Sequence, residues 1–332
     1  MTVTEKSGAE KVELTAHRRS VANGVFTGAS AAAASLILVV LAAVAAFLLT
    51  EAWPALTMDA AELGDRISWI KPEDGQSLIQ VTGYLVFGTV LIATMALLIA
   101  TPLSIGIALF ISHYAPRRLA SGLGYIIDLL AAIPSVVYGL WGSIVLIPVL
   151  QPFYDFLGTY LGWFPLFATD PTTGTVSATG RVALSASLVL AIMVIPIISS
   201  VSREVFLQTP KLHEEAALAM GATRWEMIRM AVFPFGRSGV IGATMLGLGR
   251  ALGETMAVYM ILSVGLSYSW NVLLSGKHNT IASYIAGQFP EANAIGVSAL
   301  IAMGLALFII TLLVNMAARW IVSRRSEFSG AN

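Results

Sequence analysis

The sequence predicts an all-α integral membrane protein with six transmembrane helices. Of its 332 residues, 57% are hydrophobic and only 11% are charged, whereas soluble domains carry roughly 25% charged residues. The apolar residues also gather into long runs, most of which exceed the ~20 residues that a helix needs to cross a bilayer core. Composition and run length therefore both exclude a soluble globular fold.

Six runs are expected to form the spans. The first is a retained span rather than a cleaved signal peptide, because a polar tail of residues 1–29 precedes it and its apolar run is too long. The second overshoots a bilayer core, so we expect it to be tilted or bent at Pro102. Pro134 is expected to interrupt the third span and to free backbone carbonyls. The runs cover residues 30–49, 83–111, 125–149, 182–201, 239–264 and 294–321.

The distribution of Lys and Arg predicts the orientation. Most of the 19 basic residues lie in the N-terminal tail, in the loops after the second and fourth runs, and at the C-terminus. By the positive-inside rule, both termini and the loop at about 203–237 are cytoplasmic. The expected organisation is a cytoplasmic tail (1–29), a six-helix domain (30–321) and a cytoplasmic tail (322–332). Residues 151–180, rich in turn formers, are expected to form an ordered external loop or a re-entrant element.

The composition excludes several kinds of site. The chain has no cysteine, which rules out disulfides and thiolate chemistry, and its four histidines show no metal-ligand spacing. It contains no phosphate-binding glycine loop of the kind that ATPases use. The sequence therefore predicts no catalytic residues, no metal, no cofactor and no enzymatic activity.

The cytoplasmic loop predicts two short helices. Thr209 can cap a helix whose first position is Pro210, and the helix would run over residues 211–219 and end at Gly221 in a left-handed conformation. Residues 223–226 then spell a capping box for a second short helix. Two helices joined at Gly221 would form a docking knob, residues 209–226. The alternative is a solvated hairpin.

Two ionisable residues lie deep in the fifth run. Arg250 and Glu254 are four residues apart, which places them on one face of a continuous helix. A charge at the bilayer centre costs at least ~2.5 kcal/mol, so such residues are functional candidates; the alternative is an ion pair that only neutralises itself. A guanidinium suits an oxyanion, and Thr255 could add a hydroxyl donor. Gly249, Gly253 and Ala257 would form a small-residue packing ridge.

The cytoplasmic loop resembles the EAA loop of ATP-binding-cassette importer permeases. The matching residues are Glu215, Ala216, Ala217, Gly221 and Pro234. The chain departs from the family pattern at Ala231 and Phe233. The resemblance implies that this loop is the coupling helix, which docks into a cleft of a cytoplasmic ATPase.

Two further stretches, residues 132–140 and 249–257, resemble the PstC family of phosphate-importer permeases. That resemblance implies the MetI-like permease fold and import of inorganic phosphate. It implies a PstA-like partner permease in a heterodimer, a PstB-like ATPase dimer and a PstS-like external phosphate-binding protein in a bacterial cytoplasmic membrane. The residues expected along the substrate pathway are Arg250, Glu254, Thr255, Ser135 and Tyr138.

Three alternatives are weighed against this interpretation. A permease for another oxyanion, molybdate or sulfate, would share the EAA loop but need not carry the stretch at 132–140. A regulatory or docking subunit that passes no solute would have little use for Arg250 and Glu254. An intramembrane enzyme would need a catalytic constellation inside its spans, and none is present in the sequence.

Overall fold

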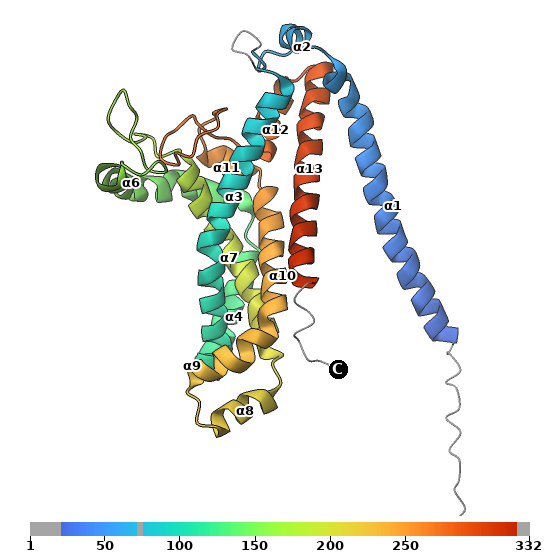
Figure 1. The fold of residues 1–332 in the computed structure, drawn as a ribbon, viewed down its shortest axis with the longest axis vertical. Helices are drawn as coiled ribbons and strands as arrows, with labels where there is room; N and C mark the ends of the chain where they lie inside the picture. Colours follow the sequence, from blue (N-terminus) through green and yellow to red (C-terminus); the bar gives the residue numbers. More distant parts are fainter. Residues whose placement is uncertain (1–20, 72–75, 324–332) are drawn as a thin grey trace, which may run out of the picture. The chain divides into compact units, whose positions relative to one another are not determined.

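The computed structural model describes residues 21–71 and 76–323, and within these ranges every regular element is a helix (Figure 1). The chain divides into two units, residues 1–47 and 48–332. The described part of the first unit is the beginning of helix α1 (Val21–Thr57), which is longer than the run predicted at 30–49. Most of the two predicted tails, residues 1–20 and 324–332, lies outside the described residues.

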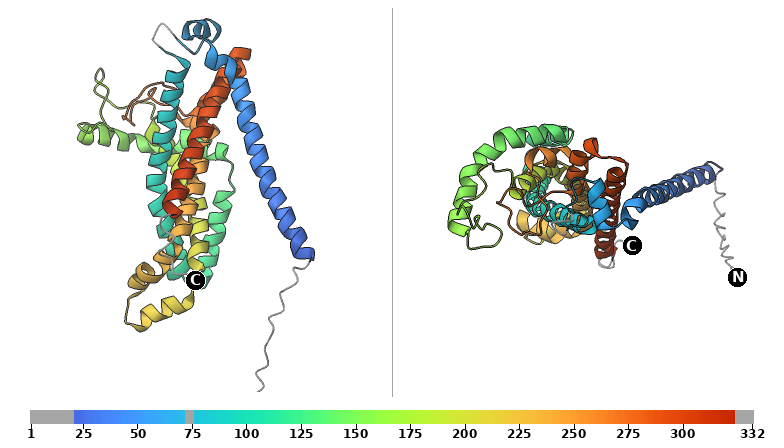
Figure 2. Two further views of the ribbon diagram at one scale, coloured as in Figure 1. Left: turned by 45° about the vertical axis from the view of Figure 1, so that its right-hand side comes forward. Right: turned by 90° about the horizontal axis from the view of Figure 1, so that it is seen from above.

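The second unit is a bundle built around four long helices, which stand side by side in Figures 1 and 2. Helix α7 packs closely against α3 and α10 and is the most enclosed of them. Helix α3 passes through Pro102 without ending, and at ~1.5 Å per residue it is longer than a bilayer core. The four are α3 (Leu78–Leu109), α7 (Ala183–Leu207), α10 (Phe233–Leu252) and α13 (Ala294–Ser323).

Six helices within the described residues are long and apolar enough to cross a membrane, as the sequence predicts. Three of the short helices lie toward the two ends of the bundle (Figure 1). Helices α2 (Ala60–Arg66) and α12 (Ile281–Gln288) are at one end, and α8 (Lys211–Ala219) is at the other. The segments predicted to be external and the predicted coupling loop therefore lie at opposite ends.

The third predicted span, 125–149, is wrong in its bounds, whereas the predicted interruption at Pro134 is confirmed. The chain forms α4 (Arg117–Ala131), breaks at residues 132–134 and resumes as α5 (Ser135–Trp141). A π-helical turn then leads into α6 (Ile147–Leu161), which lies across the axis of the bundle (Figures 1 and 2). Pro134 cannot donate a backbone hydrogen bond, which explains where the helix stops.

The fifth predicted span, 239–264, is wrong in its continuity and in its bounds. Its helix begins early, with α9 (Arg224–Met227), and continues through a π-helical turn into α10, which ends at Leu252. After a break at residues 253–255, the chain forms only the short α11 (Met256–Ile261). The second helix of the predicted knob is thus the start of this span rather than a separate short helix.

Two irregular segments, residues 162–182 and 262–280, cover the bundle near α11 and α12. They hold each other through backbone hydrogen bonds: the N–H of Ser177 donates to the carbonyl of Leu273 (3.1 Å), and the N–H of Val272 donates to the carbonyl of Leu166 (2.9 Å). The side-chain amide of Asn271 donates to the carbonyl of Ala168 (2.6 Å). The segment predicted at 151–180 therefore begins as part of α6 and ends as an ordered loop.

Candidate functional site

The two sequence stretches singled out above, 132–140 and 249–257, meet in the structure. Helix α5 packs along α11, and a Cβ atom added at Gly139 would lie 2.7 Å from the Cα of Ala257. Only glycine permits this approach, because real Cβ atoms keep a larger distance from backbone. Each stretch contains a helix break, so the structure places two breaks beside each other in the bundle.

The break at residues 132–134 is stabilised by a side chain. Pro134 has no N–H with which to bond the carbonyl of Leu130, which instead accepts the N–H of Ile133 (3.3 Å) and the hydroxyl of Tyr138 (2.9 Å). Tyr138 is buried, while Ser135, the first residue of α5, is partly exposed. The hydroxyl proton of Tyr138 therefore serves the backbone, as polar groups inside a membrane protein must.

The break at residues 253–255 corrects the predicted relation of Arg250 and Glu254. They do not share a continuous helix, because α10 ends between them. Glu254 is only 8% exposed, and its Oε1 accepts the N–H of Ala257 (3.1 Å), which caps α11. Thr255 donates its hydroxyl to the carbonyl of Gly253 (3.2 Å). The ion pair with Arg250, which the sequence analysis gave as the alternative interpretation, is absent from the salt bridges of the described residues.

Arg250 lies in the last turn of α10 with unused hydrogen-bonding capacity. Its Nε is buried and has no partner, and its charge lies within electrostatic range of the Tyr138 hydroxyl. Arg250 also lines a cavity of about 840 Å³ between α7, α10 and α13. An unpaired guanidinium facing a cavity inside a membrane protein is suited to an anion.

The cavity contains polar residues that the sequence analysis did not assign to the site. Asn315 and Arg319, one turn apart on α13, line it together with Ser238 of α10. Sequence reasoning counted Arg319 only as part of a positive C-terminal region. Its spacing of four residues from Asn315 was the available signal, because both fall on one face of an otherwise apolar helix.

The docking knob matches most of its prediction. Helix α8 covers the expected residues 211–219, Gly221 has φ of +86°, and Thr223 and Glu226 form the expected capping box. The predicted cap at Thr209 is wrong: its hydroxyl is buried without a partner, and Pro210 occupies the N-cap. Since proline here precedes the first helical residue instead of occupying it, the threonine lies one position too early to cap.

The faces of α8 are clearly divided. Ala217 is buried in a small core that includes Phe206 and Ile228, whereas Glu215 and Ala216 are exposed. The exposed surface of the knob is partly apolar; its large apolar residues are Leu212, Leu218, Met220 and Trp225. Pro234, the last residue of the EAA pattern, is exposed at the start of α10. The knob thus rests on the bundle through Ala217 and presents the rest of its motif outward.

Helix α8 is also linked to α3. Glu214 Oε1 lies 3.6 Å from His113 Nε2, an ion pair only when the histidine is protonated. The Nδ1 of the same ring lies 2.7 Å from the hydroxyl of Ser112. These contacts fix one end of the knob to the end of a long helix of the bundle.

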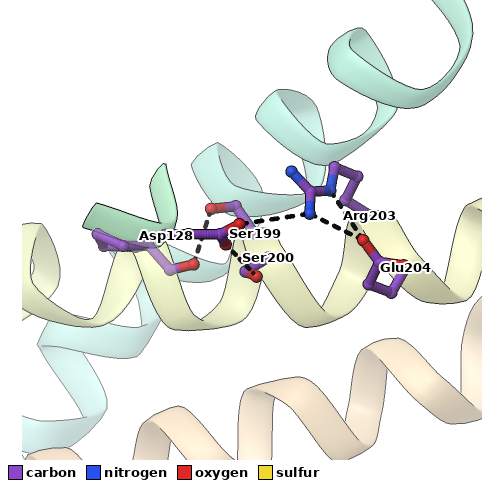
Figure 3. Close-up of polar contacts among 6 residues, drawn as sticks. Asp128, Ser199, Ser200, Arg203 and Glu204 are labelled. Carbon is purple, nitrogen blue, oxygen red and sulfur yellow. Dashed lines mark hydrogen bonds and ion pairs between the residues drawn. The ribbon is translucent and has the colours of Figure 1, made fainter. Parts of the chain in front are cut away.

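A closed polar network joins α4 and α7 near the knob (Figure 3). Arg203 contacts Glu204 at 2.8 Å and Asp128 at 3.7 Å. Ser200 donates its hydroxyl to the other oxygen of Asp128 (2.8 Å). Asp128 therefore links α4 to α7.

Within the described residues, no group of three or more His, Asp or Glu side chains could hold a metal ion. The candidate site consequently consists of Arg250 with its cavity, the two helix breaks beside it, and the docking knob. The unpaired guanidinium is the feature of this site that suits an anion.

Comparison with known proteins gives a consistent family. Residues 100–327 match the family model described as binding-protein-dependent transport system inner membrane component. The chain is 46% identical to the phosphate transport system permease protein PstC 2 of Mycobacterium bovis, covering 89% of this chain and 90% of that protein. It is 37% identical to the PstC protein of Mesorhizobium japonicum, over 96% and 95% of the two chains.

The fold also matches a solved transporter. A bacterial ABC transporter involved in the import of the acidic polysaccharide alginate aligns with a TM-score of 0.52 at 16% identity, covering 73% of this chain and 79% of that chain. At this identity the likeness concerns the fold alone. With the family match it confirms the predicted class, an all-α permease fold of the MetI-like type.

Proposed function

The chain belongs to the PstC family of phosphate transport system permease proteins, and we propose that it is the channel-forming subunit of an ATP-driven importer of inorganic phosphate. It is a multi-pass membrane protein of a transport family. The observation that carries the proposal is Arg250: its Nε is buried without a partner, and the side chain lines a cavity between three spanning helices. Phosphate supplies the charge and the oxygens that this guanidinium lacks.

The residues around the two breaks have distinct parts in the proposed pathway. Arg250 attracts the anion. Glu254 and Thr255 hold the geometry of the break next to it through their backbone hydrogen bonds. Tyr138 stabilises the opposite break, and Ser135, partly exposed beside it, is the free hydroxyl donor of the pathway. A break of this kind inside a membrane is tolerated only beside protein or a solvated cavity.

The proposed partners are inferred from two features, the absence of a nucleotide-binding loop in the sequence and the exposed face of α8. The chain has no nucleotide-binding loop, so a PstB-like ATPase dimer hydrolyses ATP for it. The exposed face of α8, with Glu215 and Ala216, docks on that ATPase, and Gly221 sets its angle. A PstA-like permease completes the channel as a heterodimer, and a PstS-like external protein delivers phosphate.

The proposed orientation places the knob and both termini in the cytoplasm of a bacterium, in accordance with the positive charge of those segments. Cysteine accessibility in sealed cells tests it, because the chain has no native cysteine. A cysteine at Ala222 should be labelled only after the membrane is opened. Labelling of intact cells by an impermeant reagent would overturn this orientation.

Transport by the purified complex tests the function. The chain is reconstituted with its partner permease, its ATPase and its binding protein in proteoliposomes, and uptake of phosphate, molybdate and sulfate is measured with ATP. We expect phosphate uptake that the other two oxyanions do not inhibit at equal concentration. Preferred uptake of molybdate or sulfate would overturn the substrate, and a fully assembled complex that carries none of the three would overturn the transport role.

A further inference from the structure

The cavity beside Arg250 extends well beyond that residue. Its lining runs along α10 from Ser238 to Arg250, a distance of about 18 Å at 1.5 Å per residue. Helix α13 runs antiparallel to α10 and contributes Asn315 and Arg319. Because α13 runs antiparallel to α10, Arg319, near the described end of α13, lies on the α8 side of Arg250, which is in the last turn of α10 (Figure 1).

The charge of this cavity is not compensated locally. Neither arginine takes part in a salt bridge among the described residues, and no described carboxylate lines the cavity. The apolar part of the wall includes Met245 and Leu246, and Leu246 is 57% exposed, so the cavity is open on that side. A cavity with two unpaired guanidinium groups and an amide between them favours an anion along its whole length.

We infer that Arg319, with Asn315 and Ser238, forms a second anion-binding position, to which phosphate passes from Arg250 before it leaves toward the end of the bundle that carries α8. This inference rests on the proposed function and adds a residue set to it. Arg250 and Arg319 project from different helices and line the same cavity. In this inference the two arginines act in sequence, and each position is weak enough to release the ion.

A phosphate group could also come from a phospholipid. A lipid with its headgroup at Arg319 would extend its acyl chains along the cavity toward Arg250. That arrangement would place hydrocarbon against a guanidinium whose Nε is already buried without a partner, which is unfavourable. A small, free oxyanion with its water fits both ends of the cavity.

The electrostatic part is tested without transport. Ser238→Cys is introduced into the chain, which has no native cysteine, and the complete complex is labelled with anionic and cationic thiol reagents of equal size. The parent complex without Ser238→Cys corrects for cysteines of the partner subunits. We expect the anionic reagent to react several-fold faster, the preference to fall several-fold with Arg319→Gln, and inorganic phosphate to slow the reaction. Equal rates for the two reagents, or a preference that Arg319→Gln leaves unchanged, would overturn the inference.

The lipid source is tested in the same experiment. Vesicles made only of zwitterionic lipid are compared with vesicles that contain phosphatidylglycerol, each with and without inorganic phosphate. Protection of the cysteine by phosphate in both kinds of vesicle supports a free oxyanion. Protection by phosphatidylglycerol alone, unaffected by phosphate, would show a lipid site and contradict the passage of the ion.

The transport part compares three variants in the reconstituted complex. Arg319→Gln should lower phosphate turnover about tenfold, since it removes one charge-assisted contact, and Arg319→Lys should fall between it and the native protein. The apparent KM should not rise, because Arg319 acts after capture. Arg118→Gln, the same charge change at the exposed start of α4 and outside the cavity, is the matched control and should transport normally.

The outcomes separate the inference from the proposed function. If the native complex imports phosphate and Arg319→Gln imports it equally well, the second position does not exist and the function stands. Loss of assembly together with uptake in Arg319→Gln would make Arg319 a packing residue instead. If the native complex carries a different oxyanion, the proposed substrate fails while the preference for the anionic thiol reagent remains.

Discussion

Two arginines of the bundle, both on helices that pack against each other, have opposite surroundings. Arg203 of α7 lies in the network between α4 and α7, where its guanidinium meets Glu204 and Asp128 and its side chain is 15% exposed. Arg250 of α10 has a buried Nε with no partner and faces a cavity. The same side chain is thus neutralised by protein in one place and left for a ligand in the other.

The difference separates structural from functional charge. A paired charge between helices can be replaced, together with its partner, at little cost. An unpaired charge in a membrane protein remains costly wherever it lies, so its presence indicates a use. The network of Arg203 lies one turn before the end of α7 and next to the docking knob, whereas the cavity of Arg250 lies between α7, α10 and α13. One region joins helices of the bundle next to the knob, and the other is the proposed path of the solute.

The largest effect is expected at Arg250. Arg250→Gln should lower phosphate uptake by about 10- to 100-fold, because one charge-assisted contact with the ion is lost. Complex yield should not change, since no protein group loses a salt bridge. Arg250→Lys should be intermediate. Uptake and yield measured side by side check this expectation.

The double variant of Arg250 and Glu254 sharpens that result. Glu254 hydrogen-bonds to the N–H of Ala257 rather than to Arg250, so adding Glu254→Gln to Arg250→Gln should restore nothing. Recovery of uptake in the double variant would mean that the two residues do form a pair in the working protein, and the contrast between the two arginines would disappear.

A smaller effect is expected at the hinge of the knob. Gly221 has φ of +86°, where a β-branched residue is strained, so Gly221→Val should cost about 1–2 kcal/mol and change the angle of α8. We expect weaker binding of the ATPase and a matching loss of uptake, with the partner permease still bound. Co-purification of each partner and uptake are the measurements.

The control for this hinge is Gly221→Asn, because asparagine tolerates positive φ better than other residues. It should retain most of the ATPase binding. If Gly221→Val bound the ATPase and transported normally, the backbone conformation at residue 221 would not matter for docking, and the knob would have to be positioned by Ala217 and Glu214 alone.

The knob and the cavity also differ in how well the sequence predicts them. The bounds of α8, the positive φ of Gly221 and the capping box of Thr223 were all predictable, because each depends on residues within one or two helical turns. The number of spans was predictable from run length. These features do not depend on tertiary packing.

The site could be predicted only in part. Arg250 could be identified from the sequence because a charge within an apolar run is rare. The helix break that separates it from Glu254 could not be identified. Periodicity assumes a continuous helix, so Gly253 was interpreted as a packing residue, although it is the point where α10 stops. Arg319 joins the cavity through the antiparallel approach of α13 to α10, a tertiary contact between segments far apart in the sequence.

The next smaller effect is expected at Arg203. Arg203→Gln leaves Asp128 without its cation, and since Asp128 is 54% exposed the loss should be about 1 kcal/mol. Adding Asp128→Asn should restore only part of the thermal stability of the complex, because Glu204 still lacks its cation. Uptake per assembled complex should remain normal in both variants. A specific loss of uptake at normal stability would place Arg203 in the pathway and end its contrast with Arg250.

The smallest effect is expected at Asp170, in the loop at 162–182, whose carboxylate accepts hydrogen bonds within its own turn. Hydrogen bonds from the hydroxyl and the N–H of Thr172 lower the pKa of its carboxyl group. The folded pKa therefore lies below the unfolded value of about 3.9, so the turn is stabilised above that pH and loses the contribution as the pH falls through the folded pKa. Hydrogen exchange at Thr172 and Thr173, corrected for the intrinsic rate, should accelerate below about pH 4. Asp170→Asn should show no such pH dependence, and because the side chain is exposed and its partners are local, uptake at neutral pH should be the same in both proteins. A clear loss of uptake in Asp170→Asn would mean that this charge, although satisfied within its own turn, also acts on the passing or arriving anion.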